Sequence, residues 1–355
     1  MSSYSPYSDL KIFHHIETID GILKGERVAP IYLRIKPTNV CNQRCFFCAY
    51  ANDNLFDDRM VETRESIPWE ILQQTLRDFA IMGGKAVTYS GGGEPLCYKN
   101  IMDALKLTNE LGLDCSMITN AQALQGETVE YLKDAKWIRV SFDASDAKIY
   151  GDIRNVKTFE QVKKNIAEFA KVKSQDCVLG INCVISKTNA DHIYDICKLV
   201  KNLGVDNIKL SPVLVKTEEQ AYHDAIKELV NEQIARAKEE LECDKFRIVD
   251  KYTDDYALSE AYVKPYHRCY IQEYFAVIAA DSKVYRCHQR AYTKAGMIGD
   301  LTKQTFEEIW KSEETVKKVR AFDPCKECNF RCAFDERNQL LNDFFMMDKN
   351  HVNFV

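Results

Sequence analysis

Short β-rich runs alternate with longer segments of helical period from residue 31 to about residue 240. This alternation is typical of repeated strand–helix units, which build a parallel sheet because each helix returns the chain to the same edge. The sequence holds six such units, too few to close an eight-stranded barrel. We therefore expect an α/β fold with an open, partial (β/α)6 TIM-like barrel, whose chemistry lies at the carboxyl ends of the strands. The predicted strands are Ile31–Lys36, Ala86–Ser90, Cys115–Ile118, Trp137–Phe142, Val178–Val184 and Asn207–Leu210.

The segments between these runs carry helix stop signals. Met82 is followed by two glycines, and Leu111 and Leu203 are each followed by one, as at the left-handed ends of helices. The predicted helices are Pro68–Met82, Lys99–Leu111, Glu127–Asp134, Thr158–Lys173, Ala190–Leu203 and Glu218–Leu241.

The chain changes character after about residue 240. It becomes rich in aromatic residues and cysteines, with a hairpin-like stretch around Phe275–Tyr285 and one helix, Thr305–Phe322. We expect this region to cover the open side of the barrel. The predicted domains are an N-terminal extension (1–30), the partial barrel (31–240) and a small α+β domain (241–355).

The charge balance and the lack of long apolar segments exclude several partners. Lysine and arginine number 48 against 53 acidic residues, a net charge of −5, whereas nucleic-acid binding needs a basic face. The amino terminus has no basic stretch followed by an apolar run, as a secretory signal requires. The longest strongly apolar stretch, Phe275–Ala280, is far shorter than the roughly 20 residues of a membrane span. We expect a cytoplasmic protein that binds neither nucleic acid nor membrane.

Cysteine is abundant, with 14 residues. The cytosol keeps thiols reduced, so clustered cysteines indicate metal ligands rather than disulfides. Six cysteines stand singly and eight fall into two groups, one near each end of the chain. The single cysteines are Cys97, Cys115, Cys177, Cys183, Cys197 and Cys243.

The first group is Cys41-x3-Cys45-x2-Cys48, directly after the first predicted strand. Three thiolates at this spacing can converge on one metal centre. A structural zinc site needs four closed ligands, whereas three cysteines alone leave a coordination position open. In an iron–sulfur cluster, that position is an iron free to bind a small molecule. A zinc fragment is the alternative.

These three cysteines resemble the cluster motif of the radical S-adenosylmethionine (radical SAM) enzymes. Phe47 is the aromatic residue that this family commonly packs beside the adenine. The segment Ser90–Pro95 resembles the Gly-Gly-Glu-Pro motif, in which Gly92 and Gly93 let the backbone approach the ligand and Glu94 accepts hydrogen bonds from the methionine ammonium. The resemblance implies S-adenosylmethionine and a 4Fe-4S cluster as cofactors.

Polar residues on later strands are further candidates for contact with S-adenosylmethionine. Ser141, at the end of the fourth predicted strand, is the better candidate there, and Asp143 could face either cofactor or substrate. Asn182, on the fifth strand, is a possible contact of the ribose. The resemblance covers residues 31 to about 215.

The second group resembles the SPASM and shorter twitch extensions of the same family, which hold auxiliary 4Fe-4S clusters. A full SPASM module has about seven cysteines, but five thiolates suffice for only one fully ligated cluster. We expect a single auxiliary 4Fe-4S cluster with Cys269 and Cys287 as ligands, and the spacing leaves open which one of the last three cysteines is not used. A zinc knuckle is the alternative. The five cysteines are Cys269, Cys287, Cys325, Cys328 and Cys332.

The resemblance implies a reaction class. Reductive cleavage of S-adenosylmethionine would give a 5′-deoxyadenosyl radical that abstracts a substrate hydrogen, and the auxiliary cluster would take the remaining electron. Dehydrogenation of an alcohol in a small polar substrate, such as a sugar, cyclitol or aminoglycoside precursor, fits this most simply. The electron donor would be a flavodoxin or ferredoxin. The candidate bases are His267, His288, Arg154 and Asp143.

Three other functions are consistent with the same motifs. A cysteine hydrogen donor would make the enzyme an epimerase, and Cys97, just after the Gly-Gly-Glu-Pro motif, is the best placed. A peptide substrate would make it a maturase, although only about 30 residues precede the first strand, and peptide-modifying relatives often carry an extra leader-binding domain. The alternative outside enzymes is a non-catalytic iron–sulfur electron carrier.

Overall fold

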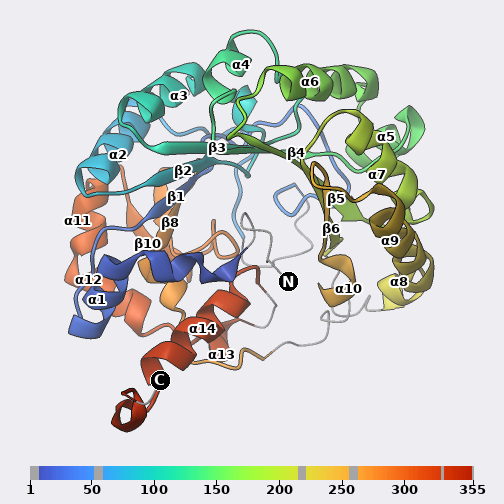
Figure 1. Cartoon of the computed structure of the whole chain (residues 1–355). Helices are drawn as coiled ribbons and strands as arrows, with labels where there is room; N and C mark the ends of the chain where they lie inside the picture. Colours follow the sequence, from blue (N-terminus) through green and yellow to red (C-terminus); the bar gives the residue numbers. More distant parts are fainter. Residues whose placement is uncertain (1–7, 52–58, 215–220, 256–262, 329–331, 354–355) are drawn as a thin grey trace.

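The computed structural model describes residues 8–51, 59–214, 221–255, 263–328 and 332–353. These residues form a ten-stranded sheet in the order β10-β9-β8-β1-β2-β3-β4-β5-β6-β7. The sheet curves into an arc, with most helices outside it (Figure 1). All six predicted strands are present, and the predicted α/β partial barrel is confirmed. The barrel strands are β1 (Tyr32–Ile35), β2 (Ala86–Tyr89), β3 (Asp114–Thr119), β4 (Trp137–Ser141), β5 (Val178–Ile185), β6 (Asn207–Pro212) and β7 (Arg247–Asp250).

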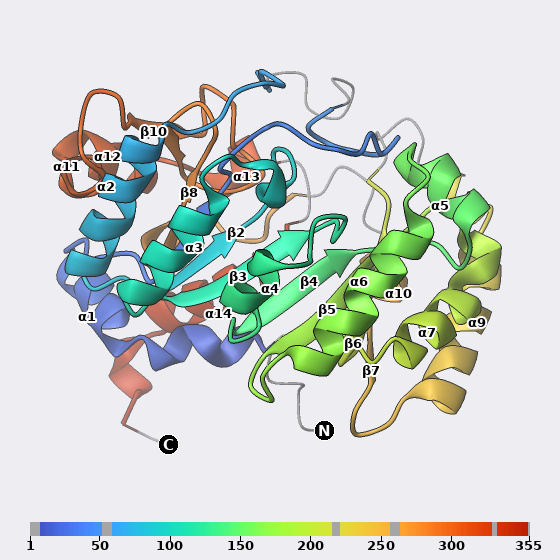
Figure 2. The ribbon, with the colours of Figure 1, turned by 90° about the horizontal axis from the view of Figure 1, so that it is seen from above.

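Parallel pairing runs from β8 through β1 to β7, so the carboxyl ends of these strands lie at one edge. Each strand from β1 to β6 is followed by at least one helix, as the alternation predicts, and Figure 2 shows these helices over the outer face. The helices of the barrel are α2 (Trp69–Ile81), α3 (Ile101–Glu110), α4 (Glu127–Leu132), α5 (Ala147–Arg154), α6 (Phe159–Val172), α7 (Ile193–Asn202), α8 (Ala221–Asp224), α9 (Lys227–Leu241) and α10 (Tyr252–Asp255), with short 3-10 turns at Pro95–Cys97 (η3) and Ala190–His192 (η4).

The helices differ from the predicted ones at two places. The last predicted helix begins at residue 218 in the sequence, but α9 begins at Lys227, and residues 218–220 lie outside the described residues. The sequence pattern missed α5, a helix of eight residues that Asp146 caps through the backbone N–H groups of Lys148 and Ile149.

The strands present two different rows of side chains because successive residues point to opposite faces. The outer row is apolar and packs against the helices, as the fully buried Leu33, Val87 and Ile138 illustrate. The residues between them face the inside of the arc and are largely polar. This contrast fixes the strand register, since a slip of one residue would turn the apolar row inward.

The parallel sheet continues past residue 240, because β7 pairs with β6 from Asn207↔Arg247 to Leu210↔Asp250. The predicted domain boundary at 240 thus precedes a strand that belongs to the sheet of the barrel. On the other side, β8 (Phe275–Ile278) pairs in parallel with β1. The C-terminal region therefore extends the sheet at its β1 end, and the division at 240 stays a prediction.

The predicted hairpin is present as β8 and β9 (Lys283–Tyr285), with Ser282 in the left-handed turn at φ 60°. The predicted helix 305–322 is instead two helices that meet at Ser312, whose hydroxyl accepts a hydrogen bond from the Thr315 N–H at 3.1 Å. The remaining elements of this region are η7 (Tyr270–Glu273), β10 (Met297–Asp300), α11 (Phe306–Lys311), α12 (Glu313–Arg320), α13 (Pro324–Glu327), α14 (Asp335–Met346) and η8 (Lys349–His351).

The N-terminal extension, with η2 (Asp9–His14) and α1 (Ile16–Lys24), packs on the C-terminal region. Arg27 and Glu273 form a buried ion pair at 3.2 Å, and the Trp310 indole N–H donates to the Val28 carbonyl at 2.7 Å. The Arg320 guanidinium, at the end of α12, donates to the Gly25 carbonyl directly after α1. These contacts join the two ends of the chain.

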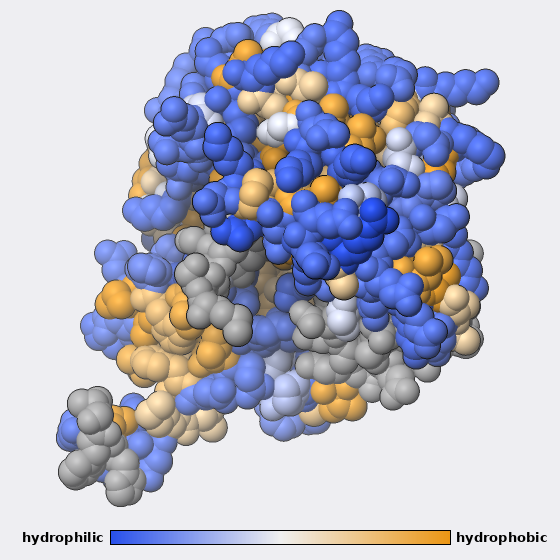
Figure 3. Space-filling model, turned by 45° about the vertical axis from the view of Figure 1, so that its right-hand side comes forward, coloured by the Kyte–Doolittle hydropathy of each residue, from blue (hydrophilic) through white to orange (hydrophobic). Residues whose placement is uncertain are grey.

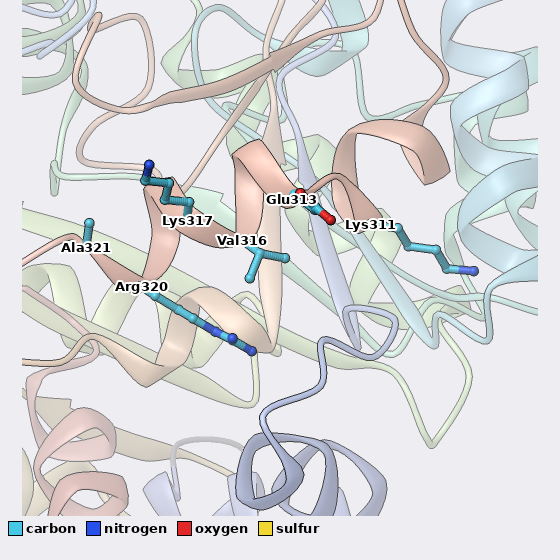
Figure 4. A pocket seen from close by; sticks show the side chains of 6 residues that line it. All are labelled: Lys311, Glu313, Val316, Lys317, Arg320 and Ala321. Carbon is cyan, nitrogen blue, oxygen red and sulfur yellow. The ribbon is translucent and has the colours of Figure 1, made fainter.

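The surface is mainly hydrophilic on the face in Figure 3, with hydrophobic side chains gathered near the C-terminal end. In that part of the chain Phe344, Met346 and Met347 are exposed. No helix among the described residues is long and apolar enough to cross a membrane. A shallow depression of about 630 Å³ is lined by side chains of α11, α12 and Ala321, and by no cysteine. Figure 4 labels these side chains.

Candidate functional site

The first cysteine group lies in the loop that follows β1, at the carboxyl edge of the sheet. Cys41 is exposed, and Cys45 and Cys48 are half-buried. The Cys48 N–H donates to the Cys45 carbonyl at 3.1 Å, which turns the chain between them. Burial raises the pKa of the half-buried Cys45 thiol. Because metal ligands must be thiolates, cluster assembly in this loop would release protons.

The glycine-rich loop after β2 packs directly against the cysteine loop. The Gly93 N–H donates to the Thr38 carbonyl at 2.8 Å, and the Glu94 N–H donates to the Val40 carbonyl at 2.9 Å. Gly92 has φ 85°, and a Cβ on Gly93 would lie 2.1 Å from the Val40 carbonyl oxygen. Only glycine therefore lets the two loops come this close.

Glu94 is buried and links the loop after β2 to the end of β3. Its Oε1 accepts from the Thr119 hydroxyl at 2.6 Å and from the Leu96 N–H at 3.2 Å, and its Oε2 accepts from the Asn120 N–H at 2.7 Å. Burial raises the pKa of this carboxyl group, and the hydrogen bond from Thr119 opposes the rise. Oε2 keeps capacity for another donor. This is consistent with the predicted role of accepting an ammonium group.

A buried ion pair contacts the cysteine loop. Arg154, the last residue of α5, pairs with Asp143 and also donates from Nη1 to the Cys45 sulfur at 3.4 Å. The other oxygen of Asp143 accepts from the Val184 N–H at 2.7 Å. Since both carboxylate oxygens are engaged and the side chain is buried, this geometry favours a positioning role for Asp143 over a role as a base.

The structure brings other predicted residues to the same edge. Ser141 and Asn182 are partners in register on β4 and β5, on the inner face. Phe47 is half-buried, and its ring lies 5.7 Å from the Arg154 guanidinium carbon. Cys97 is half-buried beneath the cysteine loop, where it accepts a hydrogen bond from the Asn42 backbone. Its role as a hydrogen donor stays a prediction.

Some residues of this edge are absent from the sequence-based prediction. Thr119 and Asn120 hold Glu94, and Tyr292 donates to the Asn39 side chain at 2.5 Å, which ties the C-terminal region to the cysteine loop. Thr119 and Asn120 could have been found from the sequence, because they are polar residues directly after a predicted strand. Nothing local indicates the contact of Tyr292, because 253 positions separate the partners.

The second cysteine group lies between η7, β9 and the segment before α14. Cys269 is within electrostatic range of Cys287 and Cys328, and Cys332 is within range of Cys269. Behind them Asp335 is buried and accepts from Lys264 at 2.6 Å, from Tyr266 at 2.5 Å and from the Cys332 N–H at 2.8 Å. This network holds the ligand loop in place.

Cys325 lies apart from that network. Its sulfur, the exposed His267 and Asp323 are the one set of three potential ligands within 4.8 Å of one another among the described residues. A single zinc ion would hold thiolate sulfurs about 3.8 Å apart, given Zn–S bonds of about 2.3 Å. In the described part of the chain, no three cysteines of either group have all their sulfurs within 4.8 Å of one another, so both groups fit a larger iron–sulfur cluster better than zinc.

Two family models match the chain. Residues 35–200 match the radical SAM superfamily, and residues 269–333 match the iron–sulfur cluster-binding (SPASM) domain. The chain therefore belongs to the radical SAM superfamily and carries a C-terminal SPASM domain. The cofactors of this class are S-adenosylmethionine, a 4Fe-4S cluster and an auxiliary iron–sulfur centre. The two cysteine groups and the glycine-rich loop after β2 fit these cofactors.

Similar proteins cover most of the chain at low identity. The PqqA peptide cyclase of Rhodopseudomonas palustris is 24% identical over 318 residues, which span 85% of this chain and 80% of the relative. The tungsten-containing aldehyde ferredoxin oxidoreductase cofactor-modifying protein of Pyrococcus furiosus is 23% identical over 336 residues, 86% and 88% of the two chains. Streptococcus suis SuiB, solved with its precursor peptide SuiA, aligns with a TM-score of 0.63 at 19% identity, covering 87% of this chain and 71% of SuiB. At this identity, the similarity to SuiB shows a shared fold.

Gly93→Ala should weaken binding of S-adenosylmethionine by at least about tenfold. The new methyl group would meet the Val40 carbonyl, so the glycine-rich loop must move away from the cysteine loop. Equilibrium dialysis of the reconstituted protein measures the affinity. Gly151→Ala is the matched control, because its Cβ has only an ordinary contact at 3.7 Å within α5. Equal affinities in the two variants would contradict the prediction.

Proposed function

We propose that the protein is a radical SAM oxidoreductase that modifies a peptide. The observation that carries this proposal is the similarity, over most of both chains, to a peptide cyclase and to an enzyme solved with its precursor peptide. The resemblance to a cofactor-modifying protein is compatible with the same chemistry on another substrate.

The chemistry of the cofactors is common to the class. When bound, S-adenosylmethionine and its 4Fe-4S cluster supply the radical that removes a substrate hydrogen atom, and the auxiliary cluster can accept the second electron. The residues of this chain hold and shield that reaction. Cys41, Cys45 and Cys48 would ligate the first cluster, while Glu94, Ser141 and Asn182 would contact the cofactor. The loops at the carboxyl edge would exclude water.

Two other outcomes use the same residues. Dehydrogenation of a small polar alcohol, the simplest expectation from the motifs, differs only in the substrate. Epimerisation would need a thiol facing the substrate. Cys97 is the candidate, and burial raises the pKa of its thiol, which favours the S–H form that a hydrogen donor needs.

The test uses the reconstituted protein with S-adenosylmethionine and a chemical reductant. A degenerate pool of short peptides and a panel of sugars, cyclitols and aminoglycosides are incubated separately, and products are analysed by mass spectrometry in deuterated and ordinary water. We expect 5′-deoxyadenosine together with peptides that have lost two hydrogen atoms. Turnover confined to the small alcohols would refute the peptide proposal, and solvent deuterium in products of unchanged composition would indicate epimerisation.

A further inference from the structure

The inner row of the barrel strands is cationic. At the inward-facing positions of β1–β8 the charged residues away from the strand ends are Arg34, Arg139 and Lys209. The others, Asp114 and Arg247, lie at the exposed amino-terminal ends. They form ion pairs with Lys136 and Asp244 at 3.6 and 3.7 Å. The interior charge of the described sheet is therefore positive.

Arg34 is the most unusual of these residues. It is half-buried on β1, in register with Thr88 and Val277, and its side chain forms no hydrogen bond or ion pair with any described residue. Its Nε is buried without a hydrogen-bond partner. A guanidinium group without partners has unused N–H donors, and their planar arrangement matches the two oxygens of a carboxylate.

Other cations gather around the same point. Lys36, two residues along β1, is fully buried and donates to the Tyr50 hydroxyl at 2.6 Å. His288, whose Nδ1 is buried without a hydrogen-bond partner among the described residues, lies within electrostatic range of Arg34, Lys36, Arg59 and Lys209. The curved sheet thus brings charges from β1 and β6 toward one imidazole ring, although four strands separate them in the sheet.

We infer that this cluster binds a carboxylate of the substrate, with Arg34 as the main contact, so that the enzyme selects a peptide with an acidic side chain near the reacting residue. The inference rests on the proposed peptide function. Mutual repulsion among the like charges and the unused donors of Arg34 destabilise this arrangement, and an anion would relieve both.

The carboxylate of S-adenosylmethionine is the other anion available. The residues predicted to contact the cofactor on the sheet, Ser141 and Asn182, end β4 and β5, whereas Arg34 lies within β1 beside β8. Arg154, which donates a hydrogen bond to the Cys45 sulfur, is a cation in direct contact with the cysteine loop. Arg34 is therefore better placed for the substrate than for the cofactor.

The test is a binding competition with the reconstituted protein and S-adenosylmethionine. The probe is a degenerate pool of short acetylated and amidated peptides whose central residue is Glu, Gln or Lys in equal amounts. Retained peptides are quantified by mass spectrometry. We expect Glu peptides to be enriched about tenfold over Gln peptides by the wild type and about equally with them by Arg34→Gln. Arg34→Glu should favour Lys peptides, a reversal that a merely structural role would not produce.

Arg77→Gln, an exposed position on α2, is the matched control and should keep the wild-type selectivity. Equal retention of Glu and Gln peptides by the wild type would overturn the inference while leaving the peptide function standing. Retention of no peptide would overturn both. A loss of S-adenosylmethionine affinity in Arg34→Gln would show that Arg34 holds the cofactor, and would also overturn the inference. The preference of the wild type for Glu over Gln peptides tests the inference even if a variant fails to fold.

Discussion

Replacing Cys41, Cys45 and Cys48 together with alanine should abolish formation of 5′-deoxyadenosine and remove about half of the bound iron. The reason is that the three thiolates hold one cluster and leave its fourth iron free for S-adenosylmethionine. The measurement is iron, labile sulfide and 5′-deoxyadenosine after anaerobic reconstitution. We expect about eight irons in the wild type and about four in the variant.

The second cysteine group supplies the complementary variant. Cys269→Ala should also lower the iron to about four, but should retain reductive cleavage of S-adenosylmethionine, because the first cysteine loop is intact. Cys243→Ala, a single exposed cysteine, is the control and should keep all the iron. About four irons in the wild type, unaffected by Cys269→Ala, would remove the auxiliary cluster and favour a redox-neutral reaction. Single variants of Cys325, Cys328 and Cys332 would show which one is not a ligand.

Asp143→Asn should destabilise the protein by about 3–5 kcal/mol, because it leaves the Arg154 charge buried without its carboxylate. The pair is buried from solvent, with side chains 6% and 1% exposed. Urea denaturation of the metal-free chain measures the change. The variant should also lose iron more readily, since Arg154 donates to the Cys45 sulfur.

Asp152→Asn is the matched control for this substitution. Asp152 lies on α5, the helix that carries Arg154, and pairs with Lys148 at 2.7 Å, but its side chain is 50% exposed, so the denaturation midpoint should hardly move. If Asp143→Asn were as stable as this control and still lost turnover, Asp143 would act in the chemistry itself rather than by positioning Arg154.

Local patterns allowed much of this protein to be predicted. The spacing of Cys41, Cys45 and Cys48 is a property of eight consecutive residues, and the six barrel strands are marked by runs of apolar residues. The strand β7 was missed because only Ile248 and Val249 of its four residues are apolar and it follows a helix rich in charge. The break between α11 and α12 was missed because Ser312 is a helix-capping residue within an otherwise continuous helical pattern.

The sequence by itself determined the family and the six strand–helix units of the barrel, and it predicted the residues that would hold two iron–sulfur centres, because each depends on short-range spacing or on apolar periodicity. Only the tertiary structure decided which side chains meet. Asp143 pairs with Arg154 behind Cys45, and Arg34 shares its surroundings with His288 and Lys209. Such contacts depend on how far the sheet curves and where its last strands join β1, and the packing of the whole chain sets both.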